Sequence, residues 1–327
     1  MNNITVVDPH LTPNLFGSGI HNYVLHLINH KNTSICFSAK GFFSFRKAYL
    51  LIKFFLKFGI TYCLNFSKNG VFLCFNHPSD WPILFLKNRS SVIHSNDYFY
   101  AINKKFFITA VNEINPLFIY GYTDHATHSP YFRSFELKHK VIELPFGFNE
   151  NRFKFKNKFK RKKMCLLLGA IEKVENLEMT SNHKYFHKHR TTLNSQFNSD
   201  VFLYNNFFEN YYSQSSIRHN SYDIVRVFNS YDFFFACFSI EQFPSAKIYE
   251  GAACGCIPVF ISNEHAEYWV NGENCIVVSA PSLDLIKKAM DKLTDDDISA
   301  IRSNLLTLAE DFSHKSISSK ILDDLKF

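Results

Sequence analysis

The sequence has no run of apolar residues long enough to cross a membrane, for which about 18 in a row are needed. It also lacks a leader-like segment at its start, because Met1 and two asparagines lead straight into an apolar stretch at 4–8. We therefore expect a cytoplasmic protein, with the inner face of the cell membrane as an alternative location.

Paired metal-binding or redox cysteines are also missing, since none of the eight cysteines forms a Cys-x-x-Cys pair. Most lie in apolar segments, so we expect buried small hydrophobic residues in a reducing compartment. Cys254 and Cys256 could be a metal or redox pair, but packing at a helix end accounts for each of them. His125 and His128 stand three residues apart without an evident third ligand, so no metal site is predicted.

The net charge of +7 is modest and is not concentrated enough to indicate nucleic-acid binding. It fits an anionic small ligand or an anionic membrane surface. A length of 327 residues suits two domains of ordinary size, each with its own core.

Strands alternate with helical stretches along the chain, which predicts a parallel α/β architecture of two doubly wound domains. The first half predicts strands at 4–8, 34–38, 71–76, 91–95, 106–110 and 141–144, with helices at 21–29, 46–58 and 82–86. The second half predicts strands at 164–168, 200–204, 231–238, 257–261 and 275–278, a helix at 222–229 and a helical tail at 283–322. A break at 144–153 and a basic tract at 154–163 divide these into domains 1–153 and 154–327.

The most informative segment, 238–262, consists of the end of a strand, a short loop, a helix and a second buried strand. Pro244 and Ser245 form a good helix opening, in which Ser245 can cap and the first amides, from Ala246 on, face outward. A helix start at the carboxyl end of a strand is where open α/β sheets bind anions. Glu241 in the loop and Glu250 on the helix can both project toward such a ligand. Two acids beside a phosphate-attracting helix end suit a sugar nucleotide.

The same segment resembles the donor-binding motif of retaining glycosyltransferases of the GT-B fold, the group 1, family 4-like enzymes. Ala253, Gly255, Pro258 and Val259 match the second half of that motif. The first half departs, because eight residues rather than seven separate Glu241 from Glu250. The resemblance implies that Glu241 contacts the donor sugar, as a catalytic residue, and that Glu250 contacts the nucleotide ribose.

Three other segments extend the resemblance. The segment from Pro145 to Phe153, with Gly147 and with Asn149 in place of an Asp, is similar to one that precedes the family's interdomain linker. Gly17 and Gly19 resemble the glycine-containing loop after the first strand, which implies a place in donor binding. His94, at the end of a strand, is the candidate for the family's sugar-contacting catalytic histidine; a histidine that is simply satisfied within its loop is the alternative.

The cations that would neutralise the donor diphosphate are less evident. Lys173 is one candidate, near the place where the family has an Arg and a Lys. Lys247 is another, because a lysine in the first turn of a helix opposes the helix dipole and needs an anionic partner. Arg190 or Arg218 are alternatives.

Two basic stretches admit two interpretations each. Arg46, Lys53 and Lys57 share one stripe of a helix that is otherwise apolar, which suits either an anionic membrane surface or a core helix with a solvated edge. The tract 154–163 interleaves lysines with phenylalanines, as nucleic-acid and membrane binders do, but a solvated linker explains it equally well.

The resemblance implies a retaining, metal-independent glycosyltransferase with no cofactor beyond its nucleotide-sugar substrate. The acceptor would be a glycan or lipid-linked glycan, as in the synthesis of O-antigen, lipopolysaccharide or capsule. The alternatives are a non-catalytic GT-B scaffold that binds a nucleotide or glycan, and a different GT-B enzyme such as an epimerase or an inverting transferase.

Overall fold

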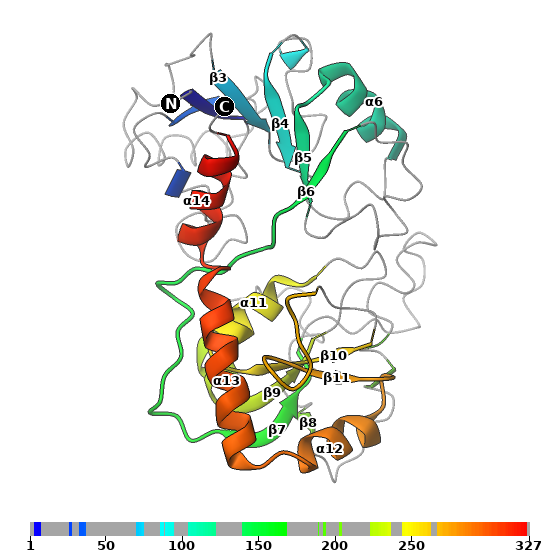
Figure 1. The fold of residues 1–327 in the computed structure, drawn as a ribbon, viewed down its shortest axis with the longest axis vertical. Coiled ribbons are helices and arrows are strands. Elements are labelled where there is room, and N and C mark those ends of the chain that lie inside the picture. The colour runs from blue at the N-terminus through cyan, green and yellow to red at the C-terminus, as the bar shows by residue number, and fades with distance from the viewer. Residues whose placement is uncertain are drawn as a thin grey trace. The chain divides into compact units, whose positions relative to one another are not determined.

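The computed structural model describes residues 3–7, 26–27, 33–36, 70–74, 86–87, 89–94, 104–121, 139–168, 189, 192–193, 203–204, 223–236, 244–262 and 267–325. It divides into two compact units (Figure 1). Unit 1 comprises Met1–Gly147 together with His314–Phe327, and unit 2 comprises Phe148–Ser313.

Unit 1 is built on a six-stranded parallel sheet with the order β2-β1-β3-β4-β5-β6. Its strands are β1 (Asn3–Val7), β2 (Thr33–Cys36), β3 (Gly70–Cys74), β4 (Ser91–His94), β5 (Phe118–Gly121) and β6 (Val141–Glu143). The second strand lies on one side of the first and the remaining strands follow on the other, which is the doubly wound arrangement that was predicted.

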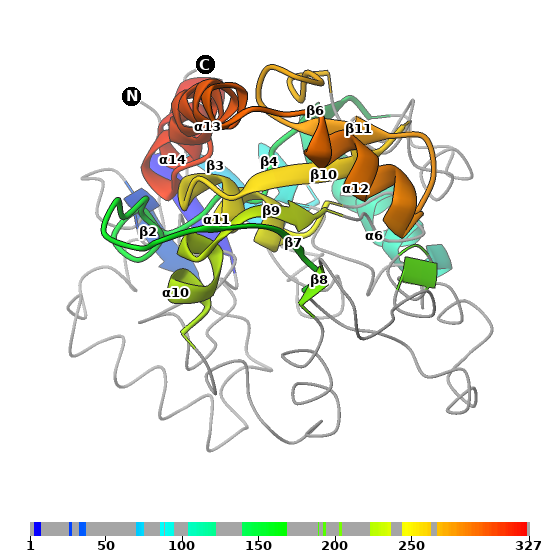
Figure 2. The same ribbon diagram turned by 90° about the horizontal axis from the view of Figure 1, so that it is seen from below.

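Unit 2 repeats this plan with a five-stranded parallel sheet of order β11-β10-β9-β7-β8. Figure 2 shows these strands following one another across the sheet. They are β7 (Lys162–Leu166), β8 (Leu203–Tyr204), β9 (Tyr231–Phe235), β10 (Ile257–Ile261) and β11 (Ile276–Val278). Its helices among the described residues are α10 (Ile224–Asn229), α11 (Ala246–Ala253), α12 (Leu283–Asp291) and α13 (Asp295–Glu310). The central strands β9 and β10 are buried along their whole length, as expected for strands covered on both faces.

One predicted strand is wrong. Residues 106–110 belong to helix α6 (Lys104–Ile114), and the strand of this region, β5, comes after it. The run from Phe106 to Ala110 is apolar enough for a buried strand, but Ala110, Val111 and Ile114 are buried at helical spacing. Asn115 ends the helix at φ 54°, and its amide donates to the Val111 carbonyl at 2.9 Å.

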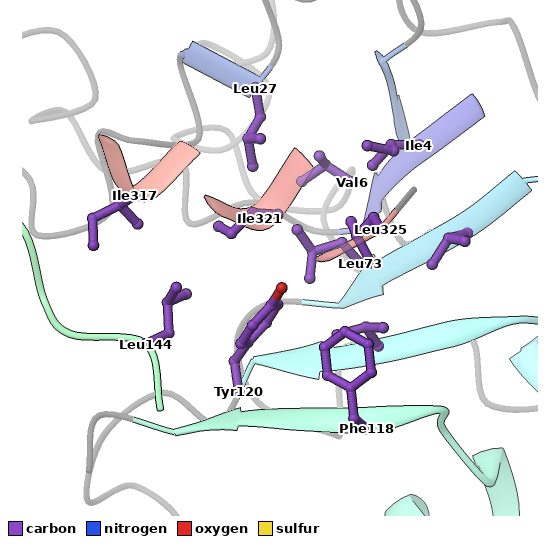
Figure 3. Packing of buried hydrophobic residues seen from close by; sticks show 12 residues of the cluster. Ile4, Val6, Leu27, Leu73, Phe118, Tyr120, Leu144, Ile317, Ile321 and Leu325 are labelled. Atoms are coloured by element: carbon purple, nitrogen blue, oxygen red, sulfur yellow. The ribbon is translucent and has the colours of Figure 1, made fainter. Parts of the chain in front are cut away.

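The predicted domain 154–327 also needs correction, because the end of the chain belongs to unit 1. The predicted tail is three helices, and the last of them, α14 (His314–Asp324), packs on the first sheet. Alternate residues of the strands, which share one face of the sheet, form a core with α14 (Figure 3). This core contains Ile4, Val6, Leu27, Val71, Leu73, Val92, Phe118, Tyr120, Leu144, Ile317, Ile321 and Leu325.

Polar contacts fix α14 to the same sheet. The Tyr120 hydroxyl donates to the Asp324 carboxylate at 2.8 Å, and the Lys320 ammonium donates to the Glu143 carbonyl at 3.0 Å. The apolar stripe of Ile317 and Ile321 therefore assigns this helix to unit 1, and the predicted boundary after Phe153 moves to between Gly147 and Phe148.

Candidate functional site

The strand order of unit 2 defines a position for a ligand. The chain goes from β7 to β8 on one side and then to β9 on the other, so the strand order reverses between β7 and β9. Open α/β sheets bind ligands beyond the carboxyl ends of the strands at such a reversal. Helix α11 is the first described element after β9, so its start is expected at this edge.

The start of α11 is built by its own sequence. Ser245 has extended backbone angles (φ −84°, ψ 142°), and its hydroxyl accepts a hydrogen bond from the Lys247 amide at 3.3 Å. The buried Pro244 precedes it. The predicted cap is therefore confirmed. First-turn amides such as that of Ala246 have no acceptor within the helix, which leaves a positive dipole end suited to an anion.

Glu250 lies one turn further along the same helix and is half-buried. Desolvation raises the pKa of its carboxyl, while the positive charges of Lys247 and Arg152 act in the opposite direction. A carboxylate flanked by two cations at a helix start combines an acceptor for ligand hydroxyls with an environment that attracts phosphate.

Arg152 is the residue that the sequence analysis missed. It lies in a turn that Asn149 organises: the Asn149 side chain accepts from the Asn151 amide at 2.9 Å, and its carbonyl accepts from the amides of Arg152 and Phe153, both at 2.9 Å. Phe153 is buried, and the Arg152 guanidinium lies 5.1 Å from the centre of its ring. The available signal was the motif from Pro145 to Phe153, in which Arg152 is the one cation.

The far end of α11 explains the second half of the motif. Gly255 has φ +69°, and the amides of Gly255 and Cys256 donate to the carbonyls of Ala252 (2.8 Å) and Gly251 (3.0 Å), which closes the helix in a Schellman motif. Gly251 lets the helix approach the sheet, because a Cβ there would lie 2.8 Å from the Phe234 ring. These glycines set how α11 lies on the sheet and hence where its start and Glu250 are presented.

The remaining predicted site residues are placed as follows. His94 ends β4 in unit 1 with a fully buried side chain, 6.4 Å between ring centroids from Tyr120. A contact of this buried imidazole with a ligand stays a prediction. Outside the described residues lie Gly17, Gly19, Lys173, Glu241 and the predicted helix with the basic stripe of Arg46, Lys53 and Lys57, as well as His125, His128, Arg218 and Arg190.

The cysteines whose side chains are described are free and buried. Burial raises the pKa of Cys254 and of Cys275 to about 12, so both are thiols rather than thiolates near neutral pH. Within the described ranges there is no cluster of three or more His, Cys, Asp or Glu side chains that could hold a metal ion. The helices described in the structure include none that is both long and apolar enough to cross a membrane.

No protein-family model matches the chain, and no curated protein matches its sequence. Solved structures do match its fold. HepE from Anabaena in complex with UDP has a TM-score of 0.61 at 13% identity, with 99% of each chain covered. Sucrose-phosphate synthase from Thermosynechococcus elongatus has a TM-score of 0.59 at 10% identity, covering 99% of this chain and 98% of the other. A glycosyltransferase from Rickettsia africae has a TM-score of 0.53 at 12% identity, again covering 99% and 98%. The chain therefore has the GT-B fold, as predicted.

Proposed function

We propose that the protein is a glycosyltransferase that uses a nucleotide-sugar donor. The observation that carries this proposal is the start of α11, the first described element after β9, where the Ala246 amide, the positive end of the helix dipole and Lys247 lie about one turn before Glu250. The GT-B fold supports it, as does the solved complex of the similarly folded HepE with UDP-glucose.

In this proposal the donor diphosphate binds at the start of α11, where the amide of Ala246, the helix dipole and the Lys247 ammonium face negative charge. The Glu250 carboxylate accepts hydrogen bonds from the ribose hydroxyls. Such bonds need the ionised carboxylate, which Lys247 and Arg152 favour against the desolvation that opposes it.

The chemistry we propose is electrostatic. As the bond between the sugar and the diphosphate breaks, the helix start stabilises the departing diphosphate, and the acceptor hydroxyl attacks the same face of the sugar. This outcome retains the anomeric configuration and needs no metal; both features rest on the motif resemblance. Glu241 would orient the donor sugar, His94 would contact it, and the loop with Gly17 and Gly19 and the ammonium of Lys173 would complete the donor contacts.

The acceptor we propose is a glycan or lipid-linked glycan of a surface polysaccharide such as O-antigen or capsule, by the same resemblance. The second candidate function is a non-catalytic GT-B scaffold that binds a nucleotide or glycan. The additional residue between Glu241 and Glu250 favours it, because a changed spacing alters how the first acid meets the sugar.

Donor binding is tested by a thermal-shift screen with UDP-, GDP-, CMP- and dTDP-sugars. A ligand at a hundred times its dissociation constant should stabilise the wild type by about 2.7 kcal/mol, which raises the melting temperature measurably. Glu250→Ala should abolish the shift, and Glu250→Gln, which keeps the size but not the charge, should reduce it. Glu273→Ala, at an exposed glutamate of the same unit, is the matched control and should respond as the wild type does.

A second measurement, made with the donor that gives a thermal shift, distinguishes the two candidate functions. A transferase should release nucleotide faster when membrane lipids or glycans from a polysaccharide-producing cell are added, and Glu250→Ala should lose that release. A shift without any release or transfer would support the scaffold. If no nucleotide class shifts the wild type, the donor site at α11 is refuted.

A further inference from the structure

Unit 2 begins with an exposed group of lysines that the proposed donor site does not use. We name residues 154–160 the lysine segment, which Figure 1 draws in green along the edge of unit 2 before β7. Its exposed lysines are Lys154, Lys156, Lys158 and Lys160. The aromatic residues between them are turned toward the protein, since Phe155 and Phe159 are half-buried and the preceding Phe153 is buried.

The backbone of the lysine segment is held in place by a buried asparagine. The Asn229 side chain, at the end of α10, donates to the Lys154 carbonyl at 3.0 Å and accepts from the Lys156 amide at 2.8 Å. Asn229 is completely buried and also donates to the Val225 carbonyl at 2.9 Å. The segment is thus fixed to α10 by paired hydrogen bonds, which distinguishes it from a loosely solvated linker.

Arg161 anchors the other end of the segment. Its guanidinium donates to the carbonyls of Tyr231 at 2.7 Å and Phe228 at 3.2 Å, and also to that of Cys254. The same guanidinium lies 5.1 Å from the centre of the Phe155 ring. Arginine and phenylalanine therefore face inward, and the lysine side chains face solvent.

Within the described part of the chain, no acidic side chain neutralises the charges of these lysines. Among the described residues none of the four forms an ion pair, and the short ion pair nearby, between Arg302 and Asp232 at 2.5 Å, uses other groups. Lys163, just beyond the segment, differs, because its ammonium donates to the Leu293 carbonyl at 2.6 Å and lies near Asp297. Four like charges on an anchored segment, with no ion pair among the described residues, repel one another, and an anionic partner would relieve this repulsion.

The orientation of the aromatic rings indicates which anionic partner fits. Proteins that bind single-stranded nucleic acid stack bases on exposed aromatic faces. Here Phe155 has the Arg161 guanidinium over its ring, and Phe159 has the Lys158 ammonium 5.7 Å from its ring centre. A surface that presents lysine charges while its aromatic rings are turned toward the protein suits the anionic headgroups of a lipid bilayer. We infer that the lysine segment binds the surface of an anionic lipid bilayer.

The expected strength follows from the number of lysines. Each lysine near an anionic membrane surface strengthens binding roughly fivefold, so four should contribute several hundredfold. The contribution should fall as salt is raised from 0.05 to 0.5 M, because the charges are exposed and are screened within about a Debye length. Donor binding at α11 is a separate property, so Glu250→Ala should leave lipid binding unchanged.

The test is sedimentation of the full-length protein with vesicles of phosphatidylcholine alone or with about a third phosphatidylglycerol, a composition chosen to give a strongly anionic surface. The test variant changes Lys154, Lys156, Lys158 and Lys160 to Gln. The charge-matched control changes four other exposed lysines, Lys287, Lys288, Lys292 and Lys315, to Gln. A third variant changes the four lysines of the segment to Arg, which keeps their charge. Melting curves verify that each variant is folded.

The inference predicts that the wild type, the Arg variant and the matched control bind the anionic vesicles and that the segment variant loses at least a hundredfold. It also predicts little binding to neutral vesicles. Equal losses in the segment variant and the matched control would show that net charge alone acts, and would overturn the inference. Failure of the wild type to bind anionic vesicles would also overturn the inference. If the protein then binds a single-stranded oligonucleotide through these lysines, the partner is a nucleic acid.

Discussion

Burial of His314 should make the folded protein less stable at low pH. It is the first residue of α14, and only 2% of its surface is exposed. Burial, with a smaller contribution from the charge of His26, lowers the pKa of its imidazole from 6.5 to about 3. The folded protein therefore holds this imidazole neutral at a pH where the unfolded chain would protonate it.

Acidification should therefore lower the free energy of unfolding. Between pH 6.5 and about pH 3 the unfolded state binds a proton at this position and the folded state does not, so the free energy of unfolding falls as the pH falls. The stabilisation is complete above pH 6.5. The slope approaches about 1.4 kcal/mol per pH unit once the unfolded chain is fully protonated at this position, so about 2.3 kcal/mol is lost between pH 6.5 and pH 4.5.

The perturbation that isolates this effect is His314→Asn, which keeps a polar side chain but cannot titrate. Melting temperatures of wild type and variant are compared at pH 6.5 and pH 4.5 in the same buffer system. The wild type should lose about 5 to 9 °C more than the variant over this interval, given about 2–4 °C per kcal/mol for a folding unit of 150–250 residues. The double difference cancels the titration of all other groups and any constant destabilisation by Asn.

His26→Asn is the control, because the charge of His26 is the smaller cause of the lowered pKa of His314. It should leave most of the pH dependence in place. Melting temperatures of wild type and His314→Asn that fall in parallel between pH 6.5 and pH 4.5 would refute the reasoning, since they would mean that His314 binds no fewer protons in the folded state than in the unfolded state.

Two further substitutions, each with its own control, test the contacts of α11 with the residues around it. Gly255→Ala should destabilise unit 2 by about 2–3 kcal/mol in urea denaturation, because φ is +69° and the new Cβ would lie 2.8 Å from Phe155. Gly272→Ala, also at positive φ but with no atom within 4 Å of the new Cβ, should cost only about 1 kcal/mol, and equal losses would exclude the packing contribution. Arg152→Ala should raise the pKa of Glu250 further, weaken donor binding roughly fivefold at pH 7 and move its loss on acidification to higher pH, whereas Arg152→Lys should retain binding. Titration calorimetry at several pH values checks this, and an unchanged affinity of Arg152→Ala would remove Arg152 from the site.

Local sequence patterns were sufficient to predict most strands of the two sheets. Strands such as β9 and β10 are short runs of mostly aromatic and apolar residues between polar segments, a pattern typical of strands buried on both faces. The start of α11 was likewise predictable, since the cap Ser245 acts on an amide only two residues away. The same local reasoning failed at 106–110, where a short apolar run fits a strand and a helix equally and only the buried positions Ala110, Val111 and Ile114 distinguish them.

The place of α14 could not be predicted because its sequence specifies an apolar stripe but not the surface that the stripe covers. Ile317 and Ile321 would serve equally well on either sheet. The choice depends on pairings across more than 170 positions, such as Lys320 with the Glu143 carbonyl, which no sequence window contains.

The proximity of Arg152 to Glu250 could not be predicted for the same reason. The two residues lie in segments almost a hundred positions apart in the sequence, and each fits a local motif by itself. Only the folded unit 2, in which the turn at Asn149 is packed through Phe153, brings the guanidinium near enough to act on the pKa of the carboxyl. A motif can therefore suggest a candidate acid from the sequence, whereas the cation that opposes the rise in its pKa is found only once the chain has folded.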